Sequence, residues 1–383
     1  MKLSVPKETA AGERRVATVP EAVKKLSADG VEIVVDPGAG EEAHLLDDAF
    51  VEAGAKVEAD SGFSGDVVAK VQPPSAEEIG RMSEGTVLIG FLQPLTNGDT
   101  AKALADAGVT SFAMEAVPRI TRAQSMDALS SQATVGGYRA ALIAAQELGR
   151  FFPMLTTAAG TIRPAKVLVL GAGVAGLQAI ATARRLGAVL SAFDVRSAVE
   201  EQIKSLGAKF VTLDIGLEDA EDAGGYARPL TEEEQGRQRE ALADVIEGMD
   251  GVISTAAVPG RPAPLLIIED AVKRMKPGSV IVDLAAETGG NCELTEAGKT
   301  VVKHDVKIVG PTNLPASMPD HASQLYAKNV QSLLGLMVGE EGKLELNFDD
   351  EIIAGACITR DGEIVHEGAK KAAGVAKKEE AGG

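Results

Sequence analysis

The stretch KVLVLGAGVAGLQAIATARRLGAVLSAFDVR, residues 166–196, decides the fold. Its opening run, residues 167–170, consists of valine and leucine and is typical of a strand that is buried on both faces. A helix-period segment extends from about residue 174 to residue 186. Between strand and helix stand three glycines in G-x-G-x-x-G spacing: Gly171, Gly173 and Gly176. A strand, a glycine turn and a helix in this order predict the start of a parallel βαβ unit.

The spacing of these glycines suits a bound dinucleotide. Gly171 permits the tight turn, Gly173 lets the backbone approach a pyrophosphate, and Gly176 lets the helix pack close to the strand. The helix begins with Val174 and Ala175, and its first amide groups offer phosphates a partial positive charge. The turn therefore predicts a cofactor site, and a merely tight strand-to-helix connection is the weaker interpretation.

A carboxylate follows the second strand of this unit. The apolar run of residues 189–193 ends in Asp194, about 20 residues beyond the glycines, where a partner for the adenosine ribose hydroxyls belongs. Asp194 would repel a 2′-phosphate, which favours NAD(H) over NADP(H), although the nearby Arg196 weakens this argument. Val195 lies between the two and completes the expected contact set.

Composition excludes several kinds of partner. The net charge of −18 over 383 residues argues against nucleic acid and against an anionic lipid surface. Two cysteines and no signal peptide predict a cytoplasmic protein. The long uncharged run of residues 167–183 falls short of the ~20 residues that a membrane span requires. We therefore expect no direct membrane insertion.

The spacing of apolar runs predicts two Rossmann-like α/β domains with parallel sheets and a cleft between them. The N-terminal domain is expected to comprise residues 1–127 plus 310–366. Residues 128–309 should form the dinucleotide-binding Rossmann domain, in which strands and helices alternate. Residues 367–383 are expected to be a flexible tail.

Three other segments carry expectations. The polar loop of residues 118–132 offers guanidinium, amide, carboxylate and hydroxyl groups to a ligand; alternatively, it is a solvated connection in which Asp127 begins the next helix. The insertion of residues 217–246 contains Tyr226, which is expected to lie on a mobile flap, or else in an inert loop. Near the C-terminus we expect strands at 343–348 and 352–358.

The supply of acid-base residues is small. Hydride transfer between two nicotinamides needs no acid or base, whereas oxidation of an alcohol or amine does. The chain has four histidines, and none stands beside a nucleophile or at metal-ligand spacing: His44, His304, His321 and His366. The sequence therefore predicts no metal site.

Several motifs are together similar to the NAD(H)-binding component of proton-translocating nicotinamide nucleotide transhydrogenase. The resemblance extends from residue 1 to about residue 366. Its motifs are GERRVATVPE (12–21), KVQPP (70–74), PRITRAQSMDALSS (118–131), the glycine fingerprint, AGGYA (223–227), PGRPAP (259–264), MKPGSVIVDLA (275–285), ETGGN (287–291) and GPTN (310–313).

The resemblance implies an oxidoreductase subunit that is a soluble homodimer. It implies a position at the cytoplasmic face of the inner membrane, held there by a membrane-spanning component. Bound NADH would pass hydride directly to NADP⁺ on a third, NADP(H)-binding component. The family's residues carry over to Arg119, Gln124, Asp127 and Ser130, which would hold the nicotinamide carboxamide and its ribose, with the first three as the catalytic set. Tyr226 would close over the nucleotide.

The same superfamily includes alanine dehydrogenase, which is the competing interpretation. Arg15 and Lys70 match its substrate-carboxylate residues. However, alanine dehydrogenase has an LHLA motif with a catalytic histidine, whereas this chain has LQPL at residues 92–95. The side chain of Gln93 cannot take up a proton. Its aspartate before Q-G-G is replaced by Glu287. These departures favour the transhydrogenase. A non-catalytic NAD-sensing module is a third interpretation, and tight nucleotide binding without turnover would identify it.

Overall fold

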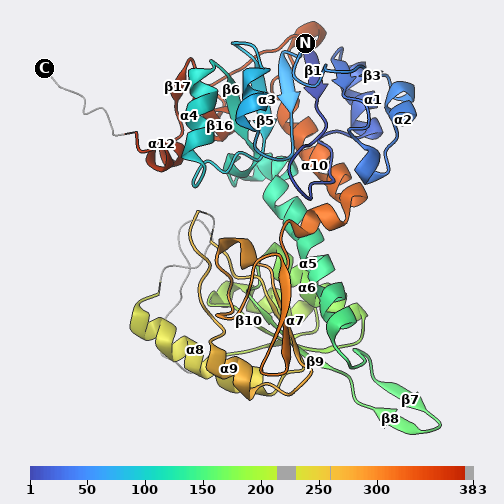
Figure 1. Ribbon diagram of the computed structural model, residues 1–383, viewed down its shortest axis with the longest axis vertical. Helices are drawn as coiled ribbons and strands as arrows, with labels where there is room; N and C mark the ends of the chain where they lie inside the picture. Colours follow the sequence, from blue (N-terminus) through green and yellow to red (C-terminus); the bar gives the residue numbers. More distant parts are fainter. Residues whose placement is uncertain (214–229, 259, 376–383) are drawn as a thin grey trace, which may run out of the picture. The chain divides into compact units, whose positions relative to one another are not determined.

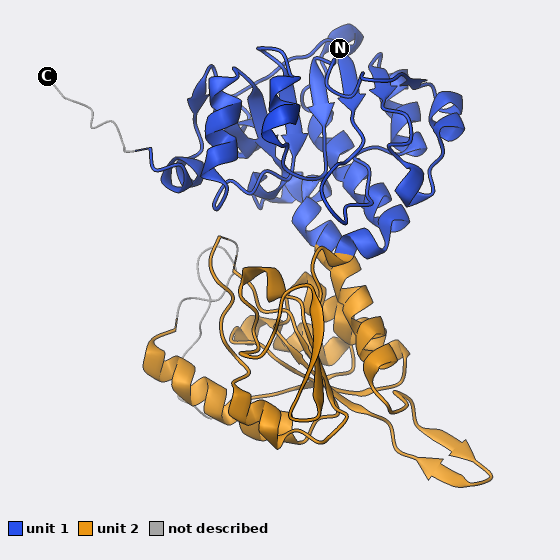
Figure 2. Cartoon of the chain, in the orientation of Figure 1, with its two compact units in different colours: residues 1–132, 315–383 blue, residues 133–314 orange. Residues whose placement is uncertain are grey.

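The computed structural model describes residues 1–213, 230–258 and 260–375 (Figure 1). The chain divides into two compact units (Figure 2). Unit 1 consists of Met1–Gln132 and Pro315–Gly383, and unit 2 of Ala133–Leu314. Both are α/β units whose sheets are mainly parallel, so the predicted fold class is confirmed. From the sequence, we expect the limits between the domains at residues 127 and 309.

Unit 1 is built on an eight-stranded sheet. The strands are β1 Lys2–Val5, β2 Glu32–Val35, β3 Lys56–Val57, β4 Val67–Ala69, β5 Val87–Gly90, β6 Thr110–Ala113, β16 Cys357–Arg360 and β17 Glu363–Ile364. Their order is β17-β16-β6-β5-β4-β1-β2-β3, and all neighbours are parallel except those that involve β16 and β17. Buried apolar runs such as VVA and VLIG form the central strands because helices cover both faces of the sheet.

Two groups of helices cover this sheet. The helices are α1 Pro20–Ala28, α2 Asp47–Glu52, α3 Ala76–Gly80, α4 Gly98–Asp106, α10 Pro319–Leu334, α11 Glu351–Ala356 and α12 Glu367–Ala372, with short 3-10 turns η1 Glu41–Ala43, η2 Met114–Ala116, η3 Thr121–Met126 and η7 Glu340–Gly342. One apolar core contains side chains of α1, α2, α10 and α11, and a second contains those of α3, α4 and α12. The sheet therefore lies between two packed layers.

Three expectations near the C-terminus are wrong. Residues 352–356 are helical, because Asp350 caps α11 by accepting the amide of Ile352 at 2.8 Å, and Ile352, Ile353 and Ala356 are buried on its inner side. The proposed strand at 343–348 contributes only a bridge at Leu344. Residues 367–372, expected to belong to a flexible tail, form α12.

Unit 2 is built on a seven-stranded sheet in the order β11-β10-β9-β12-β13-β15-β14, in which only β14 is antiparallel. Its strands are β9 Lys166–Leu170, β10 Val189–Phe193, β11 Lys209–Phe210, β12 Gly251–Ser254, β13 Val280–Asp283, β14 Lys299–Lys303 and β15 Val306–Gly310. Its helices are α5 Ala128–Glu147, which begins in unit 1, α6 Val174–Arg185, α7 Glu200–Ser205, α8 Glu232–Glu247 and α9 Glu269–Arg274, with turns η4 Ser197–Val199, η5 Ala286–Thr288 and η6 Leu314–Ser317.

The helices of unit 2 form two layers, as in a doubly wound fold. One core packs residues of α5, α6 and α7 on the sheet, and the other packs residues of α8 and α9. A separate hairpin, β7 Leu155–Thr157 and β8 Gly160–Ile162, extends away from this sheet (Figure 1). None of the helices in the described part of the chain has the length and apolar character needed to cross a bilayer.

Candidate functional site

The glycine turn between β9 and α6 is held against the end of β12. Gly171 adopts a φ of +89°, which L side chains rarely adopt. A Cβ at this position would stand 2.9 Å from the Thr255 hydroxyl oxygen and 3.0 Å from the Ala256 amide nitrogen. The same hydroxyl donates to the carbonyl of Gly171 at 3.0 Å. Gly171 is therefore required by the backbone conformation and by packing.

The other two glycines differ from each other. A Cβ at Gly176 would overlap the carbonyl oxygen of Gly171, so the close approach of helix and turn requires glycine there. At Gly173 no described atom lies within 4 Å of the Cβ position, and φ is an ordinary −74°. The packing of the described residues therefore does not explain why position 173 is glycine.

The N-terminus of α6 is open. Gly173 is its N-cap and supplies no side-chain hydrogen bond to the first turn, in which Val174 is 41% exposed. The first amides of an α-helix have no partner within the helix. The turn therefore presents the amides that begin at Val174 and Ala175, together with the positive end of the helix dipole, to an anion.

Asp194 lies beside this turn. Its Oδ2 accepts the amide of Ala172 at 2.7 Å, and its Oδ1 accepts the amide of Arg196 at 2.9 Å. The guanidinium of Arg196 donates from Nε and Nη2, each at 2.9 Å. Burial disfavours the charge, but these hydrogen bonds outweigh it and lower the pKa of Asp194. Val195 packs on the core that lies under α8 and α9.

A cavity of about 290 Å³ in unit 1 gathers most of the candidate residues of the polar loop. Its lining includes Glu115, Arg119, Gln124 and Asp127, contributed by η2, η3 and the segment around them. Met114, Val117 and Ile120 supply apolar surface beside these polar groups. Convergent polar groups of this kind can fix the orientation of a small-molecule ligand.

The fourth candidate residue of this loop is bound to the third. The Ser130 hydroxyl donates to Asp127 Oδ2 at 2.6 Å, and the Ser130 amide donates to Asp127 Oδ1 at 2.9 Å. Asp127 thus satisfies an amide at the start of α5, which is the capping role of the alternative interpretation. Because Asp127 also lines the cavity, the two roles are compatible.

The loop is anchored at both ends of η3. Arg122 makes a bidentate pair with Asp350 at 2.7 and 2.8 Å, and this pair lowers the pKa of Asp350 to about 2. Asn329 of α10 donates to the carbonyl of Ser125 at 2.8 Å. Arg122 therefore has a structural partner, which the sequence could not distinguish from a ligand contact.

Sequence reasoning missed Glu115. Its Oε1 accepts the amides of Leu92 and Gln93 at 2.9 and 2.6 Å, while its Oε2 is buried and has no partner among the described residues. Burial raises the pKa of Glu115 to about 7, against the lowering effect of these amides. No motif marks this residue, because its burial arises from contacts between distant strands.

We expect the Glu115→Gln variant to be more stable than the parent above pH 7, by up to about 3 kcal/mol. The pKa of Glu115 is higher in the folded chain than the unfolded value of 4.5. The protonated carboxyl therefore contributes stability that is fully present below pH 4.5 and is lost as the pH rises through 7. Urea unfolding at pH 5 and pH 8 measures this effect. A stability difference between variant and parent that is the same at both pH values would contradict it.

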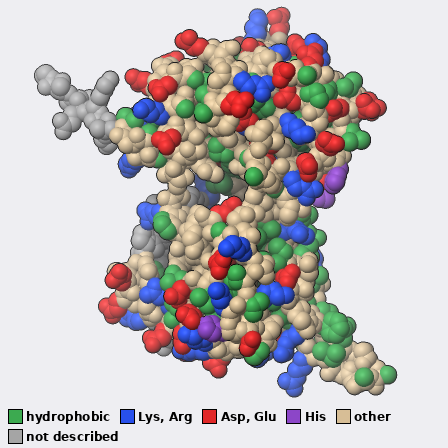
Figure 3. Space-filling view, viewed as in Figure 1, with side chains coloured by type: hydrophobic (Ala, Val, Ile, Leu, Met, Phe, Trp, Pro, Cys, Tyr) green, Lys and Arg blue, Asp and Glu red, His purple; other side chains and the backbone are tan. Residues whose placement is uncertain are grey.

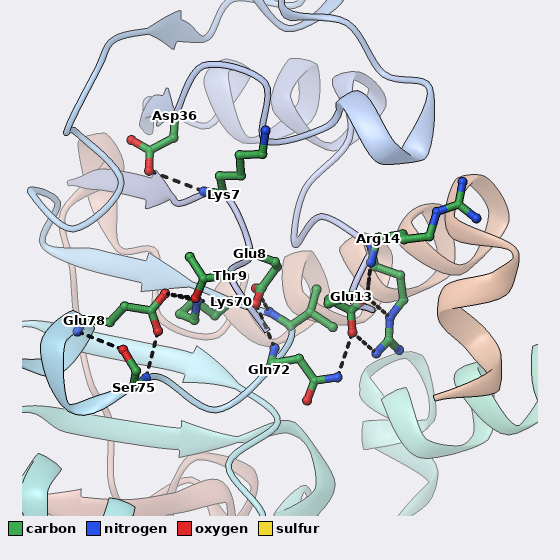
Figure 4. A network of polar contacts seen from close by, with 12 residues as sticks. Lys7, Glu8, Thr9, Glu13, Arg14, Asp36, Lys70, Gln72, Ser75 and Glu78 are labelled. Carbon is green, nitrogen blue, oxygen red and sulfur yellow. Dashed lines mark hydrogen bonds and ion pairs between the residues drawn. The ribbon is translucent and has the colours of Figure 1, made fainter. Parts of the chain in front are cut away.

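Arg15 and Lys70, the residues matched to a substrate carboxylate, are both buried in unit 1. Figure 4 shows Lys70 in a network of polar contacts. Arg15 is 4% exposed and pairs with Glu13 through two hydrogen bonds of 2.8 and 2.7 Å. Lys70 is 1% exposed and pairs with Glu8 and Glu78 at 3.3 and 2.9 Å. Both cations thus already have carboxylate partners within unit 1.

The other reactive side chains have ordinary structural surroundings. His304 pairs with Glu269 at 2.8 Å, and His366 caps α12. Burial raises the pKa of both cysteine thiols to about 11, which leaves them protonated and unreactive at neutral pH. No group of three His, Cys, Asp or Glu side chains suited to a metal occurs within the described ranges.

The predicted site residues fall into two groups. The glycines, the start of α6 and residues 194–196 lie together in unit 2, and the polar-loop residues lie together in unit 1. Tyr226 lies outside the described residues.

Two family models match the chain. The model described as "Alanine dehydrogenase/PNT, N-terminal domain" matches residues 4–136, and "Alanine dehydrogenase/PNT, C-terminal domain" matches residues 140–367. Among curated proteins, the chain is 51% identical to a Rhodospirillum rubrum protein named as the first portion of NAD(P) transhydrogenase subunit alpha, covering 96% of this chain and 98% of that protein. It is 30% identical to the alanine dehydrogenase of Bacillus subtilis, covering 96% and 93%.

Solved structures give the same picture. The transhydrogenase from Sinorhizobium meliloti matches with a TM-score of 0.87 and 46% identity, covering 95% of this chain and all of that one. An L-alanine dehydrogenase matches with a TM-score of 0.80 and 25% identity, covering 97% and 99%.

Proposed function

Because this chain belongs to the alanine dehydrogenase/PNT family, we propose that it is the NAD(H)-binding subunit of a proton-translocating NAD(P) transhydrogenase. In this proposal the chain presents NADH for direct hydride transfer to NADP⁺ on a partner component. The observation that most supports NAD(H) binding is that Gly173 differs from Gly171 and Gly176 in the space around its Cβ position. Packing requires glycine at positions 171 and 176 but not at position 173, where a pyrophosphate would approach the backbone.

The roles of the remaining residues follow from their surroundings. The pyrophosphate rests on the amides at the start of α6, and Asp194 accepts hydrogen bonds from the adenosine ribose. Arg119, Gln124 and Asp127, which line the cavity of unit 1, hold the nicotinamide carboxamide and ribose, with Ser130 positioning Asp127. For Tyr226, which lies outside the described residues, the proposed role of closing over the nucleotide comes from the family resemblance.

Hydride transfer between two nicotinamides fits the chemistry of the cavity. Among the described residues that line it, none is a histidine, a lysine or a cysteine, and its two carboxylates, Glu115 and Asp127, each accept hydrogen bonds from other groups of the chain. Gln93 stands where the resemblance places the catalytic histidine of alanine dehydrogenase. Its side chain is an amide that cannot take up a proton. The contributions of this chain are therefore to position the nicotinamide ring and to exclude competing reactions.

The proposed assembly is a homodimer at the cytoplasmic face of the inner membrane. A membrane-spanning component holds it there, and an NADP(H)-binding component supplies the acceptor. The relatives are named as transhydrogenase alpha subunits, which supports a place in an assembly with other components.

Reconstitution tests the proposed function directly. The purified chain is mixed with an NADP(H)-binding component, and hydride transfer is followed with NADH and an oxidised NAD analogue that absorbs separately. Transfer that requires both proteins supports the proposal. Oxidation of NADH by the chain alone, dependent on pyruvate and ammonia, would establish an alanine dehydrogenase instead. Tight NADH binding without either reaction would identify a sensing module.

The β7–β8 hairpin is the surface that we propose for the homodimer contact. Its strands and the segment before them expose three large apolar side chains: Phe151, 53%; Met154, 64%; and Ile162, 45%. Figure 3 shows hydrophobic side chains on this projecting element. A two-stranded hairpin has little stability alone, and a second copy of the chain would cover these side chains.

We expect Met154→Asp combined with Ile162→Asp to convert the dimer to a monomer, because two charges would have to be buried in the contact. Light scattering coupled to size-exclusion chromatography measures the mass. Val302→Asp, at a position that is 64% exposed on β14, is the matched control and should leave the mass unchanged. A dimer that persists in the double variant would exclude this surface.

A further inference from the structure

The carboxylate of Asp194 is saturated with donors. Oδ1 accepts the amide and the Nε of Arg196, and Oδ2 accepts the amide of Ala172 and the Nη2 of Arg196, at distances between 2.7 and 2.9 Å. An ionised carboxylate has about four lone-pair positions. Two of them are thus used by backbone amides that are part of the turn, and two by one guanidinium.

A ribose that presents both hydroxyls needs two of these positions. The backbone amides of Ala172 and Arg196 are fixed by the turn and by the start of η4, so their positions cannot be vacated without moving the chain. The guanidinium is the end of a flexible side chain that is 18% exposed, whereas the Asp194 side chain is 6% exposed. Of these donors, only the guanidinium can leave without moving the backbone.

We propose that the Arg196 side chain competes with the adenosine ribose for Asp194 and sets the affinity of this chain for NAD(H). The inference rests on the proposed function. Without nucleotide the guanidinium satisfies a nearly buried carboxylate. When the nucleotide binds, the 2′ and 3′ hydroxyls take the two positions from which the guanidinium moves aside. Part of the free energy of ribose binding is used to break the two charge-assisted hydrogen bonds of this pair.

At Asp194 this competition treats the two nicotinamide nucleotides differently, although the displaced guanidinium would itself attract a 2′-phosphate. The ribose of NAD(H) replaces both lost donors, because it brings two hydroxyl groups. A 2′-phosphate has no proton to donate at neutral pH, apart from a minor monoanionic fraction, so NADP(H) replaces only one. A lost donor that is not replaced leaves the Asp194 charge partly unsatisfied in a nearly buried position, which is unfavourable.

The test is the affinity of Arg196 variants for NADH, measured by fluorescence titration with folding checked by circular dichroism. Arg196→Met, which keeps much of the aliphatic stem and loses every donor, should bind NADH about threefold to tenfold more tightly than the parent. Arg196→Lys, with a single ammonium group, should fall between the two. Arg185→Met removes an exposed cation from the last turn of α6 and controls for net charge; its affinity should stay within about twofold of the parent.

The second part of the test compares the affinities of parent and variant for two adenosine monophosphates. The gain in Arg196→Met should persist for AMP and vanish for 2′,3′-dideoxy-AMP, which has neither hydroxyl. Weaker or unchanged NADH binding by Arg196→Met would overturn the inference, as would an equal gain for the dideoxy ligand. Failure of the parent chain to bind NADH would instead refute the proposed function, so the two failures are distinguishable.

Discussion

The Gly173→Ala variant is expected to fold normally and to bind NADH about 100-fold more weakly than the parent. No described atom lies within 4 Å of the new Cβ, and the φ of −74° accepts alanine. The cost to the folded chain should be that of a poorer N-cap, up to about 1 kcal/mol. The Cβ would instead meet the pyrophosphate. Loss of two charge-assisted hydrogen bonds from backbone amides corresponds to about two orders of magnitude in affinity.

The matched comparison is Gly176→Ala, three residues along the same turn. Its Cβ would overlap the carbonyl oxygen of Gly171, so the turn itself has to move. We expect a loss of about 1–3 kcal/mol in stability, visible as a lower thermal unfolding midpoint, in addition to weaker binding. NADH titration and thermal unfolding of both variants separate the two effects. Unchanged NADH affinity in Gly173→Ala would mean that the phosphates do not rest on this turn.

The Arg15→Met variant is expected to be less stable than the parent by about 3–5 kcal/mol. The Glu13 side chain is 0% exposed and would keep its charge without its bidentate partner. Arg15 also donates to Gln132 at 2.8 Å, so a second buried group loses a partner. Arg14→Met is the control, because Arg14 pairs with Glu42 at the surface and should change stability by less than about 1 kcal/mol.

The pH dependence of unfolding provides an independent measure of the same pair. Burial alone would raise the pKa of Glu13, but the hydrogen bonds and charge of Arg15 outweigh burial and hold it at about 2. Because the unfolded value is 4.5, this group adds about 3 kcal/mol of stability above pH 4.5 that is lost as the pH falls towards 2. In Arg15→Met this dependence should flatten. An unchanged acid-unfolding curve would show that Arg15 is not what lowers the pKa.

Much of unit 2 could be predicted because its signals are local. A strand, a glycine turn, a helix and a carboxylate follow one another within residues 166–194, and hydrogen bonds between Gly171 and Phe193 and between Ala172 and Asp194 close the unit. Backbone conformation and helix-strand packing need glycine at particular positions, and short-range spacing reveals such needs.

The failures near the C-terminus have the opposite cause. The apolar spacing of residues 352–358 matches neither the helix period nor the strand period clearly. A short apolar run does not distinguish a helix from a strand. Asp350 favours the helix, because its carboxylate caps α11. Arg122, which lies more than 200 residues earlier in the sequence, holds that carboxylate in place. Sequence order contains no trace of this pairing.

By itself, the sequence determined the α/β class, the glycine turn and the position of Asp194, since each depends on neighbours within one βαβ unit. Tertiary structure alone decided which charges are already paired: Arg15 with Glu13, Lys70 with Glu8 and Glu78, and Asp194 with four donors at once. It also decided that Oε2 of Glu115 is buried and has no partner among the described residues. Desolvation and pairing depend on which groups meet in space, and this follows from packing between distant segments.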